Sequence, residues 1–489
     1  MLRKTKIVCT LGPSTDQEGV MRNMIVSGMN VARFNFSHGS HEEHAARLAK
    51  LRALRDELCM PVAALLDTKG PEIRLKNFKN GKVTLKAGQT FTLTTRDVEG
   101  DENICSITYK ELPQDLTPGA RVLLDDGLVG MKVDAIQGDD IICTVQNGGP
   151  VSNHKGVNVP GTKLSMPYMS AQDRDDILFG IEQGFDFIAA SFVRSAADIL
   201  EIRRLLDSRK CDFIKIVAKI ENHEGVENID EILNVADGIM VARGDLGVEL
   251  PAEAIPNTQR RIVEKCICAK RPVIIATQML YSMVKSPRPT RAEVSDVASA
   301  IYERVDAVML SDETAMGDYP VESVETMARV AREIERDETH FKPMIDMDMV
   351  SVNHEITAQL ARSAVRASTN LPIKYVVLDT KTGRTGRYLA AFRGRKTVMA
   401  VCYQLHAQRI LALSYGVVPI LRNQELHDKY HFLVDALEFL DQYRKLKGED
   451  LLAIVGGSFG PDGGASYVEI ANVDNIRRRN EEIVAAQKC

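Results

Sequence analysis

The chain has 489 residues, more than one hydrophobic core usually supports, so two to four domains are expected. A net charge of −5 without a long basic run argues against a nucleic-acid partner. No apolar run approaches the roughly 20 residues of a membrane helix, so no membrane partner is expected. Nine scattered cysteines without a C-x-x-C pair favour a reduced, cytoplasmic protein.

The start of the chain predicts three strand–helix units. Short apolar runs form the strands, and the third run is followed by a Gly-Pro break. The strands are expected at 6–10, 30–35 and 62–67, and the helices near 18–26 and at 41–58.

A different texture follows the third strand. Between residues 78 and 159 the helical period is lost, and short alternating segments are separated by Gly or Asp turns. This pattern predicts a small β-barrel domain inserted into the chain.

Helix–strand alternation resumes near residue 170 and predicts five more strands. They are expected at 186–191, 213–219, 238–243, 272–277 and 306–311. Eight strands that alternate with helices are typical of a (β/α)₈ TIM barrel, here interrupted once. Because chemistry in such barrels gathers at the carboxyl ends of the strands, the insertion is a candidate lid over that end.

The last third of the chain alternates again and predicts an open-sheet α/β domain. Its five strands are expected at 374–380, 396–402, 416–421, 450–457 and 466–473. The predicted domains are the barrel (1–69 and 167–343), the inserted β domain (70–166) and the C-terminal α/β domain (344–489).

Charged side chains at the ends of two neighbouring strands carry the strongest functional signal. Lys219 and Glu221, in KIENHEG, share one face of a strand, and Asp245 follows the next strand. Two carboxylates suit Mg²⁺, and the adjacent ammonium can neutralise a transferring phosphoryl group. A structural salt bridge would explain Lys219 and Glu221 alone, but the addition of Asp245 favours a phosphoryl-transfer site.

The ARGDLG motif follows the same strand. Gly244 and Gly247 let the backbone approach a ligand closely, and a helix is expected to begin there. Free amides at its start would bind an anion such as a carboxylate, although an ordinary glycine turn is the alternative.

A second polar group follows the strand at 30–35. Arg33, Asn35 and Ser37 share one face, and Asp67 and the Thr68 carbonyl lie on the adjacent strand. Arg33 offers a planar fork for phosphate. The oxygens carry one negative charge and suit a large monovalent cation, but hydrogen bonding at the barrel mouth is equally compatible with them.

Hydroxyl groups end two further strands, at Thr277 and Ser311. Such hydroxyls can relay a proton, but most cap the following helix, and the sequence slightly favours capping. The spacing of His38, His41 and His44 suggests a metal site less strongly than it suggests the start of a helix.

The C-terminal domain contains two glycine-rich segments, DTKTGRTGR and GGSFGPDGGAS. The first follows a strand, and its amides and polar side chains suit a phosphate, so that an effector site and an ordinary turn remain equally plausible. The candidate effector residues are Thr380, Lys381, Thr382, Arg384 and Thr385.

Several long motifs resemble the signatures of the pyruvate kinase family in order and spacing. They are RFNFSHG, LLDTKGPEIR, KIEN, VARGDLGVE, ATQMLYSM and PRPTRAEVSDVA. The resemblance covers nearly the whole chain, including the insertion and the C-terminal domain. It implies a cytoplasmic, homotetrameric enzyme that transfers a phosphoryl group from phosphoenolpyruvate to ADP, the last step of glycolysis.

The resemblance also implies a role for each site residue. Glu221 and Asp245 would hold Mg²⁺ or Mn²⁺, Lys219 would stabilise the phosphoryl group, and Arg33 would contact the phosphate. The residues that would seat the substrate carboxylate are Ala242, Gly244, Asp245 and Thr277, with Thr277 and Ser311 as the catalytic hydroxyls. The residues that would hold K⁺ are Asn35, Ser37, Asp67 and Thr68. The nucleotide contacts would be Asn35, His38, Arg74 and Lys155. In this family a Glu at the position of Glu72 accompanies K⁺ dependence.

Two other functions explain part of the pattern. A Mg²⁺-dependent lyase or aldolase acting on an enolate would use Glu221 and Asp245, but would leave Arg74, Lys155 and the insertion without a task. An inactive regulator that binds a sugar phosphate through the C-terminal domain would not need the charged residues of the barrel.

Overall fold

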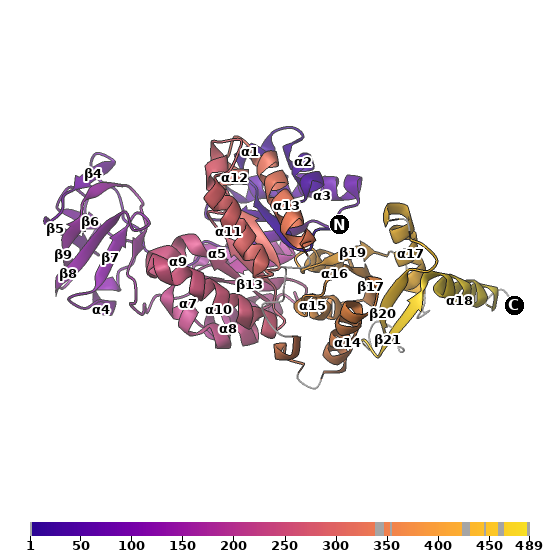
Figure 1. Ribbon diagram of the computed structural model, residues 1–489. Helices are drawn as coiled ribbons and strands as arrows, with labels where there is room; N and C mark the ends of the chain where they lie inside the picture. The colour runs from indigo at the N-terminus through magenta and orange to yellow at the C-terminus, as the bar shows by residue number, and fades with distance from the viewer. Residues whose placement is uncertain are drawn as a thin grey trace.

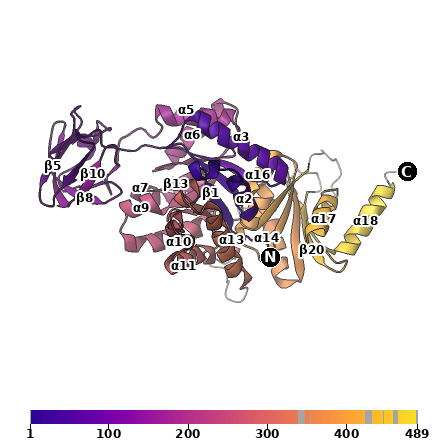
Figure 2. The same ribbon diagram turned by 90° about the horizontal axis from the view of Figure 1, so that it is seen from above.

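The computed structural model describes residues 2–337, 347–352, 355–422, 431–444, 446–457 and 464–486. A barrel lies at the centre, with the β-rich insertion at one end and the C-terminal domain at the other (Figure 1). In the view from above, narrow connecting segments join the insertion to the barrel (Figure 2). The predicted combination of a TIM barrel, a β-rich insertion and a C-terminal α/β domain is confirmed.

Eight parallel strands close the barrel in the order β1-β16-β15-β14-β13-β12-β3-β2. They are β1 (Lys6–Thr10), β2 (Val31–Asn35), β3 (Ala63–Asp67), β12 (Phe187–Ala190), β13 (Lys215–Ile220), β14 (Gly238–Ala242), β15 (Val273–Ala276) and β16 (Ala307–Leu310). Each lies within two residues of its predicted position. The predictions succeed because strands covered on both faces are continuous apolar runs.

Helices surround the barrel, and capping signals set several of their starts. The predicted helix at 41–58 is α3 (His41–Leu58), which begins after Ser40 with a capping box to Glu43. The others are α1 (Pro13–Asp16), α2 (Val20–Ser27), α5 (Ala171–Glu182), α6 (Ala196–Ser208), α7 (His223–Glu227), α8 (Ile229–Val235), α9 (Arg243–Glu249), α10 (Ile255–Cys268), α11 (Arg291–Tyr302), α12 (Asp312–Ala315) and α13 (Pro320–Arg336), with short 3₁₀ helices at Ala252–Ala254 and Tyr281–Val284.

The insertion has a hydrophobic core of its own, built from residues between Ile73 and Val159. Its strands form a six-stranded sheet, β11-β7-β8-β9-β5-β6, and a two-stranded sheet, β10-β4. They are β4 (Lys82–Leu85), β5 (Thr90–Thr94), β6 (Ile104–Ser106), β7 (Arg121–Leu124), β8 (Val129–Gln137), β9 (Asp140–Asn147), β10 (Gly149–Ser152) and β11 (Val157–Asn158), with the helix α4 (Leu112–Asp115). A separate core allows the insertion to move as a unit.

The C-terminal domain contains a five-stranded sheet in the order β19-β18-β17-β20-β21, with only β21 antiparallel to its neighbour. Its strands match the predicted ones and are β17 (Ile373–Thr380), β18 (Val398–Cys402), β19 (Val417–Leu421), β20 (Leu451–Gly456) and β21 (Tyr467–Asn472). Its helices are α14 (Ile356–Asn370), α15 (Arg384–Ala391), α16 (Leu405–Leu411), α17 (His431–Arg444) and α18 (Val473–Ala486), and a 3₁₀ helix lies at Met347–Met349.

Buried ion pairs attach the C-terminal domain to the base of the barrel. Asp306, just before β16, accepts two hydrogen bonds from the Arg393 guanidinium and one from the Tyr415 amide. The main hydrophobic core also continues from the barrel into this domain. The barrel and the C-terminal domain therefore share one core, whereas the insertion has a core of its own.

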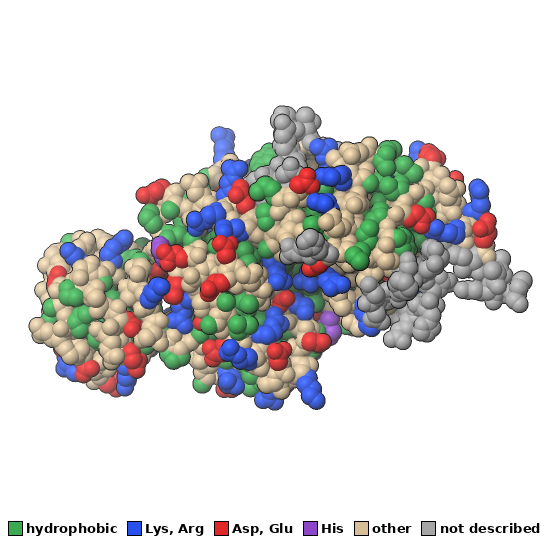
Figure 3. Space-filling model, turned by 90° about the horizontal axis from the view of Figure 1, so that it is seen from below, with side chains coloured by type: hydrophobic (Ala, Val, Ile, Leu, Met, Phe, Trp, Pro, Cys, Tyr) green, Lys and Arg blue, Asp and Glu red, His purple; other side chains and the backbone are tan. Residues whose placement is uncertain are grey.

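Charged side chains of both signs are interspersed over the face seen from below, where a narrow waist separates the insertion from the barrel (Figure 3). Among the described residues, every helix is too short or too polar to cross a bilayer.

Candidate active site

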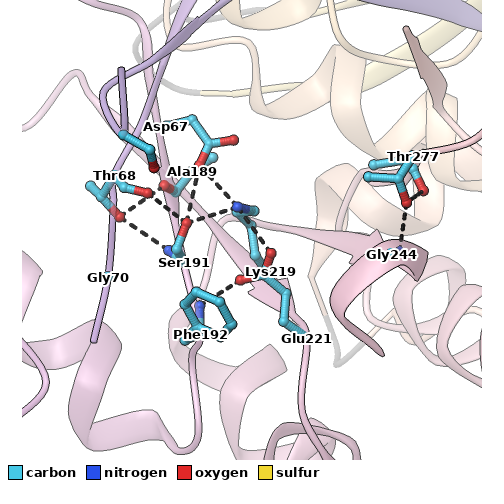
Figure 4. A network of polar contacts seen from close by, with 12 residues as sticks. Asp67, Thr68, Gly70, Ala189, Ser191, Phe192, Lys219, Glu221, Gly244 and Thr277 are labelled. Carbon is cyan, nitrogen blue, oxygen red and sulfur yellow. Dashed lines mark hydrogen bonds and ion pairs between the residues drawn. The ribbon is translucent and has the colours of Figure 1, made fainter. Parts of the chain in front are cut away.

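Lys219 occupies the centre of a buried polar cluster at the carboxyl end of the barrel (Figure 4). Its Nζ lies 3.0 Å from an oxygen of Glu221 and 3.0 Å from one of Asp67. The same nitrogen donates to Ser191 Oγ at 2.8 Å. The predicted pairing of Lys219 and Glu221 is therefore present, and Asp67 joins it from the other side.

Asp245, in the first turn of α9, completes the acidic part of the cluster. Its carboxyl group lies close enough to that of Glu221 for its charge to raise the pKa of Glu221. Burial raises the pKa of Glu221 to about 7, although the positive charge of Lys219 lowers it. The negative charges of Asp245 and Asp67 raise it further. Burial likewise raises the pKa of Asp245. The two groups thus resist being ionised together, which is the behaviour expected of carboxylates that share a cation.

The opposite effect acts on the ion-paired members of the cluster. Burial favours a protonated Asp67, but the charges of Arg33 and Lys219 hold the pKa of its carboxyl below the usual value. Burial also opposes the charge on Lys219, yet Asp67 and Glu221 raise the pKa of its ammonium group. Lys219 therefore keeps its positive charge at neutral pH.

The neighbouring strands β2 and β3 place Arg33 and Asn35 beside this cluster. Arg33 Nε donates to Asp67 Oδ2 at 2.5 Å, and Asn35 is the register partner of Asp67. Asn35 Oδ1 accepts the Ser37 amide at 3.2 Å, and the Thr68 carbonyl accepts Ser191 Oγ at 2.6 Å. Asn35, Asp67 and Thr68 of the predicted oxygen set thus lie at one corner of the mouth, where protein donors already bind their oxygens. Ser37 takes part in these contacts through its amide.

The two strand-end hydroxyls do not cap the helices that follow them. Thr277 Oγ1 accepts the Gly244 amide at 2.7 Å and so bridges to α9 across the mouth (Figure 4). Ser311 precedes α12, but its Oγ makes no capping bond and is buried without a hydrogen-bond partner among the described residues. The carboxylate of Glu313 accepts the Ser311 amide instead, at 2.7 Å. The interpretation of these hydroxyls as helix caps is therefore wrong.

The backbone at Thr277 is also unusual, because its φ is +70° and that of Gln278 is +55°. A β-branched residue in the left-handed region is strained, and such strain is commonly held at functional sites.

The amide of Gly244, expected to be free to bind an anion, already donates to Thr277 Oγ1. A carboxylate bound here would therefore also need hydrogen bonds from other groups of the turn.

A cleft of about 440 Å³ lies between the barrel mouth and the insertion. It is lined by His38, Arg74, Lys155 and Asp245, so three of the four predicted nucleotide contacts share one cavity with a predicted metal ligand. Arg74 is paired with Glu72 at 2.6 Å and Lys155 with Asp125 at 2.9 Å. Asn35 instead lies at the end of β2.

Comparison with known proteins identifies the family and its domains. The family model described as "Pyruvate kinase, barrel domain" matches residues 2–324, and "Pyruvate kinase, alpha/beta domain" matches residues 358–471. This chain belongs to the pyruvate kinase family. Members of that family are phosphotransferases, and the mouth of this barrel provides the charges that such chemistry needs.

Individual pyruvate kinases match over most of the chain. The protein of Geobacillus stearothermophilus is 49% identical over 419 residues, which are 85% of this chain and 71% of that protein. The protein of Sporosarcina psychrophila is 43% identical over 99% of this chain and 82% of its own length. The protein of Clostridium perfringens is 41% identical over 96% of this chain and over its full length.

The histidines near α3 have structural contacts that fit the predicted helix start. His41 is bonded to Asp176 at 2.6 Å and stacks on Phe179, and the buried His44 stacks on Phe36. Neither ring is oriented by the cluster around Lys219, so these two side chains belong to the packing of α3.

The predicted effector segment lines a second cavity, of about 290 Å³, at the ends of β17 and β20. Thr380, Lys381, Thr382, Arg384 and Thr385 all contribute, and Gly456, Gly457 and Gly464 of the second glycine-rich segment face them. Residues 458–463 of that segment lie outside the described residues. Burial raises the pKa of Asp379, also in this cavity, to about 6.

Sequence reasoning missed two residues that bind the polar cluster around Lys219 and Glu221. Ser191 ends a strand as Thr277 and Ser311 do, so the same signal was available for it. Phe192, whose amide donates to Glu221 Oε2 at 2.6 Å, has a φ of +53° that no feature of the sequence indicates.

Proposed function

We propose that this chain transfers the phosphoryl group of phosphoenolpyruvate to ADP, giving pyruvate and ATP in the last step of glycolysis. The observation that carries the proposal is the buried cluster of Lys219, Glu221 and Asp245 at the mouth of the barrel, with Asp245 exposed to the cleft. One positive and two negative groups at one point suit two anionic substrates that meet around a cation.

The residues present fit a divalent cation. Glu221 and Asp245 are adjacent carboxyls whose pKa values are raised by burial, and hard cations such as Mg²⁺ or Mn²⁺ take one or two carboxylates of this kind. Bound there, the cation would neutralise charge on the phosphoryl group. Phe192 and Lys219 hold the Glu221 carboxylate in place through contacts of 2.6 and 3.0 Å.

The basic side chains orient and stabilise the transferring group. Lys219 is positively charged, buried and fixed by three oxygen partners, so its position requires little reorganisation during transfer. Arg33 is held by Asp67 and by Thr10 Oγ1 at 3.0 Å, and its remaining donors are available for phosphate oxygens. The protein's task is therefore mainly positioning and charge stabilisation.

The pyruvate part of the substrate would lie on the other side of the mouth. Ala242 and Gly244 lie at the start of α9, where Thr277 Oγ1 accepts the Gly244 amide from the end of the next strand, and Asp245 of the same helix turn belongs to the proposed cation site. After transfer, the enolate must be protonated at carbon. Ser311, whose buried Oγ has no partner among the described residues, and Thr277 are the proposed hydroxyls of that relay.

The insertion acts as a lid in this proposal. It has its own core and reaches the barrel across the cleft, where Arg74 and Lys155 face His38. Closure over ADP would bring these side chains to the nucleotide and its second divalent cation and would exclude water from the reacting phosphate.

A monovalent cation completes the proposed site. Asn35, Ser37, Asp67 and Thr68 supply oxygens at one corner, and Glu72 rather than a lysine occupies the position that accompanies K⁺ dependence in this family. K⁺ would add positive charge next to Arg33 and would share the Asp67 carboxylate with Arg33 and Lys219.

One coupled assay tests the proposal against its alternatives. ATP formation is measured from phosphoenolpyruvate and ADP with Mg²⁺, with and without K⁺. We expect ATP only with Mg²⁺, and faster formation with K⁺. Absence of ATP under all conditions would refute the proposal. Cleavage of a longer oxo acid would then favour the lyase or aldolase, and binding of a sugar phosphate without turnover would favour the inactive regulator.

We further propose that the second cavity binds a phosphorylated effector. Lys381, Arg384 and Arg387 line it, and α15 begins there after Gly383, which has no side chain to cap the first amides. A thermal-shift panel of phosphometabolites should show binding that Lys381→Ala and Arg384→Ala abolish. Ligand-induced stabilisation that survives both changes would exclude this cavity.

We also propose that the protein is a homotetramer. Light scattering of the purified protein tests this by measuring its molecular mass.

A further inference from the structure

The loop between β12 and α6, residues 191–195, contacts the segment through which the chain returns from the insertion to the barrel. Arg194 Nη1 donates to the Leu164 carbonyl at 3.1 Å and to the Met166 carbonyl at 3.0 Å. One guanidinium of the barrel therefore holds two carbonyls of this return segment.

The residue between those carbonyls is held by the insertion instead. Ser165 donates from its amide to Asp115 Oδ2 at 3.0 Å and from Oγ to Asp115 Oδ1 at 2.8 Å. Tyr109 Oη adds a contact of 2.9 Å to Ser165 Oγ. The side chains of Leu164 and Met166 also pack against the core of the insertion. The return segment is therefore attached to the insertion by its side chains and to the barrel by the two carbonyls that Arg194 holds.

Arg194 is itself fixed to the barrel. Its amide donates to Asp198 Oδ2 at 2.8 Å, and its carbonyl accepts Asn228 Nδ2 at 2.8 Å. The side chain is only 17% exposed and lies 3.6 Å from Asp198. Because Arg194 is fixed in this way, a movement of the loop 191–195 would also move the Leu164 and Met166 carbonyls that its guanidinium binds.

The same loop is bonded to the catalytic cluster (Figure 4). Ser191 Oγ accepts Lys219 Nζ at 2.8 Å, and the Phe192 amide donates to Glu221 Oε2 at 2.6 Å. The outgoing connection is also close: a side chain at Gly70 would come within 3.1 Å of the Phe192 ring. Both connections of the insertion therefore lie against the loop that carries two partners of the cluster.

We propose that Arg194 is a positioning residue that couples occupation of the cation site to closure of the lid. The inference rests on the proposed function. The Glu221 carboxylate that would hold the cation also accepts the Phe192 amide. A shift of that amide would move the Arg194 guanidinium, which lies two residues further along the same loop. The return segment would move with this guanidinium, and so would Arg74 and Lys155 of the insertion, which line the cleft proposed to bind the nucleotide.

Small-angle X-ray scattering and kinetics of the full-length protein test the coupling. We expect the wild type to contract when Mn²⁺ and phosphoenolpyruvate are added, and Arg194→Ala to lose that contraction. Its kcat should fall by about 10-fold to 100-fold, with a raised KM for ADP, because the catalytic groups no longer converge. Its affinity for Mn²⁺, measured by electron paramagnetic resonance, should fall by about fivefold or less, because both carboxylates are intact and only the reciprocal coupling to closure is lost.

Matched variants separate coupling from loss of stability. Arg204→Ala removes an exposed arginine of α6 and should contract and react like the wild type. Arg194→Lys keeps the charge with one donor nitrogen and should partly restore contraction. Asp115→Asn weakens the attachment on the insertion side and should reproduce the defect even if Arg194→Ala does not fold.

Normal contraction together with normal kcat in Arg194→Ala, or in Asp115→Asn if the first variant is unfolded, would overturn the proposal. A wild type that makes no ATP would instead refute the proposed function, and the scattering comparison with Mn²⁺ and phosphoenolpyruvate would still judge the coupling.

Discussion

Lys219 Nζ lies 3.0 Å from Glu221 Oε1, and both side chains are almost completely buried. A charged pair in such a place loses much hydration, so it contributes little to stability unless further partners surround it. Here Asp67, Ser191 and the Phe192 amide supply those partners. The arrangement keeps an ammonium group rigid beside two carboxyls, which serves catalysis better than it serves folding.

Replacing Lys219 by methionine tests this role. We expect kcat to fall by about 10²–10³-fold or more with a smaller change in KM, because the lost interaction acts mainly in the transition state. Steady-state kinetics at saturating Mg²⁺ measure both values. A variant with nearly normal kcat would contradict the role of Lys219.

The raised pKa of Glu221 predicts that cation binding depends on pH. Protons and Mn²⁺ compete for the same oxygens, so the affinity for Mn²⁺ should fall by up to about tenfold per pH unit below the folded-state pKa and level off above it. That pKa is about 7. Titrations from pH 6 to 8 should show this slope in the wild type, whereas Glu221→Gln should bind weakly with a flatter profile. If the wild type bound Mn²⁺ with equal affinity at pH 6 and pH 8, competition between protons and Mn²⁺ at Glu221 would be excluded.

The same shift predicts how stability changes with pH. Glu221 titrates near 4.5 in an unfolded chain and near 7 when folded. The folded protein thus holds the extra proton between these values, and its stability falls as the pH rises through that window. Added Mn²⁺ should reverse the loss at pH 8 more than at pH 6, as thermal unfolding with and without the ion would show.

Ser191→Ala tests a residue that the sequence did not single out. Its Oγ accepts Lys219 Nζ and lies 2.6 Å from the Thr68 carbonyl. Loss of a hydrogen bond to a charged group costs about 1.5–3 kcal/mol, so kcat/KM should fall by about 10-fold to 100-fold. Ser299→Ala, whose hydroxyl bonds a carbonyl within its helix, is the control. Equal kcat/KM values for Ser191→Ala and Ser299→Ala would show that the Ser191 hydroxyl does not contribute to catalysis.

The ion pair between Asp306 and Arg393 predicts a large effect on stability. Both side chains are buried, and Arg393→Leu leaves a buried carboxylate without its cation, which costs about 3–5 kcal/mol. The apparent unfolding midpoint in urea should drop clearly. Arg22→Leu breaks the exposed pair with Glu57 and should change stability by about 1 kcal/mol or less. Similar midpoints for the two variants would show that the base of the barrel relies on other contacts.

The strands and the main site residues are predictable from the sequence for physical reasons. Buried parallel strands are apolar runs, and a TIM barrel brings their polar endings to one mouth, so Lys219 and Asp245 can be placed together without a structure. Hydrogen-bond partners are harder to predict. Nothing in the sequence indicates that Thr277 binds Gly244 rather than the next helix, or that the chain at Phe192 has a left-handed backbone.

The roles of Arg194 and Asp115 show a further limit. Their importance comes from residues 164–166, whose side chains contact the insertion while two of their carbonyls accept Arg194 of the barrel. Backbone carbonyls carry no residue-specific signal, so such an attachment emerges only when the folded chain is seen.

The strained turn at Thr277 has a consequence for any attempt to make this enzyme hardier. A non-glycine residue with positive φ costs on the order of 1–3 kcal/mol, and two consecutive ones occur here. Glycine would relax the turn but remove the hydroxyl that ties α9 to the barrel mouth. A substitution at Thr277 that raises thermal stability is therefore expected to lower kcat. Stabilising substitutions are better placed in segments remote from this turn.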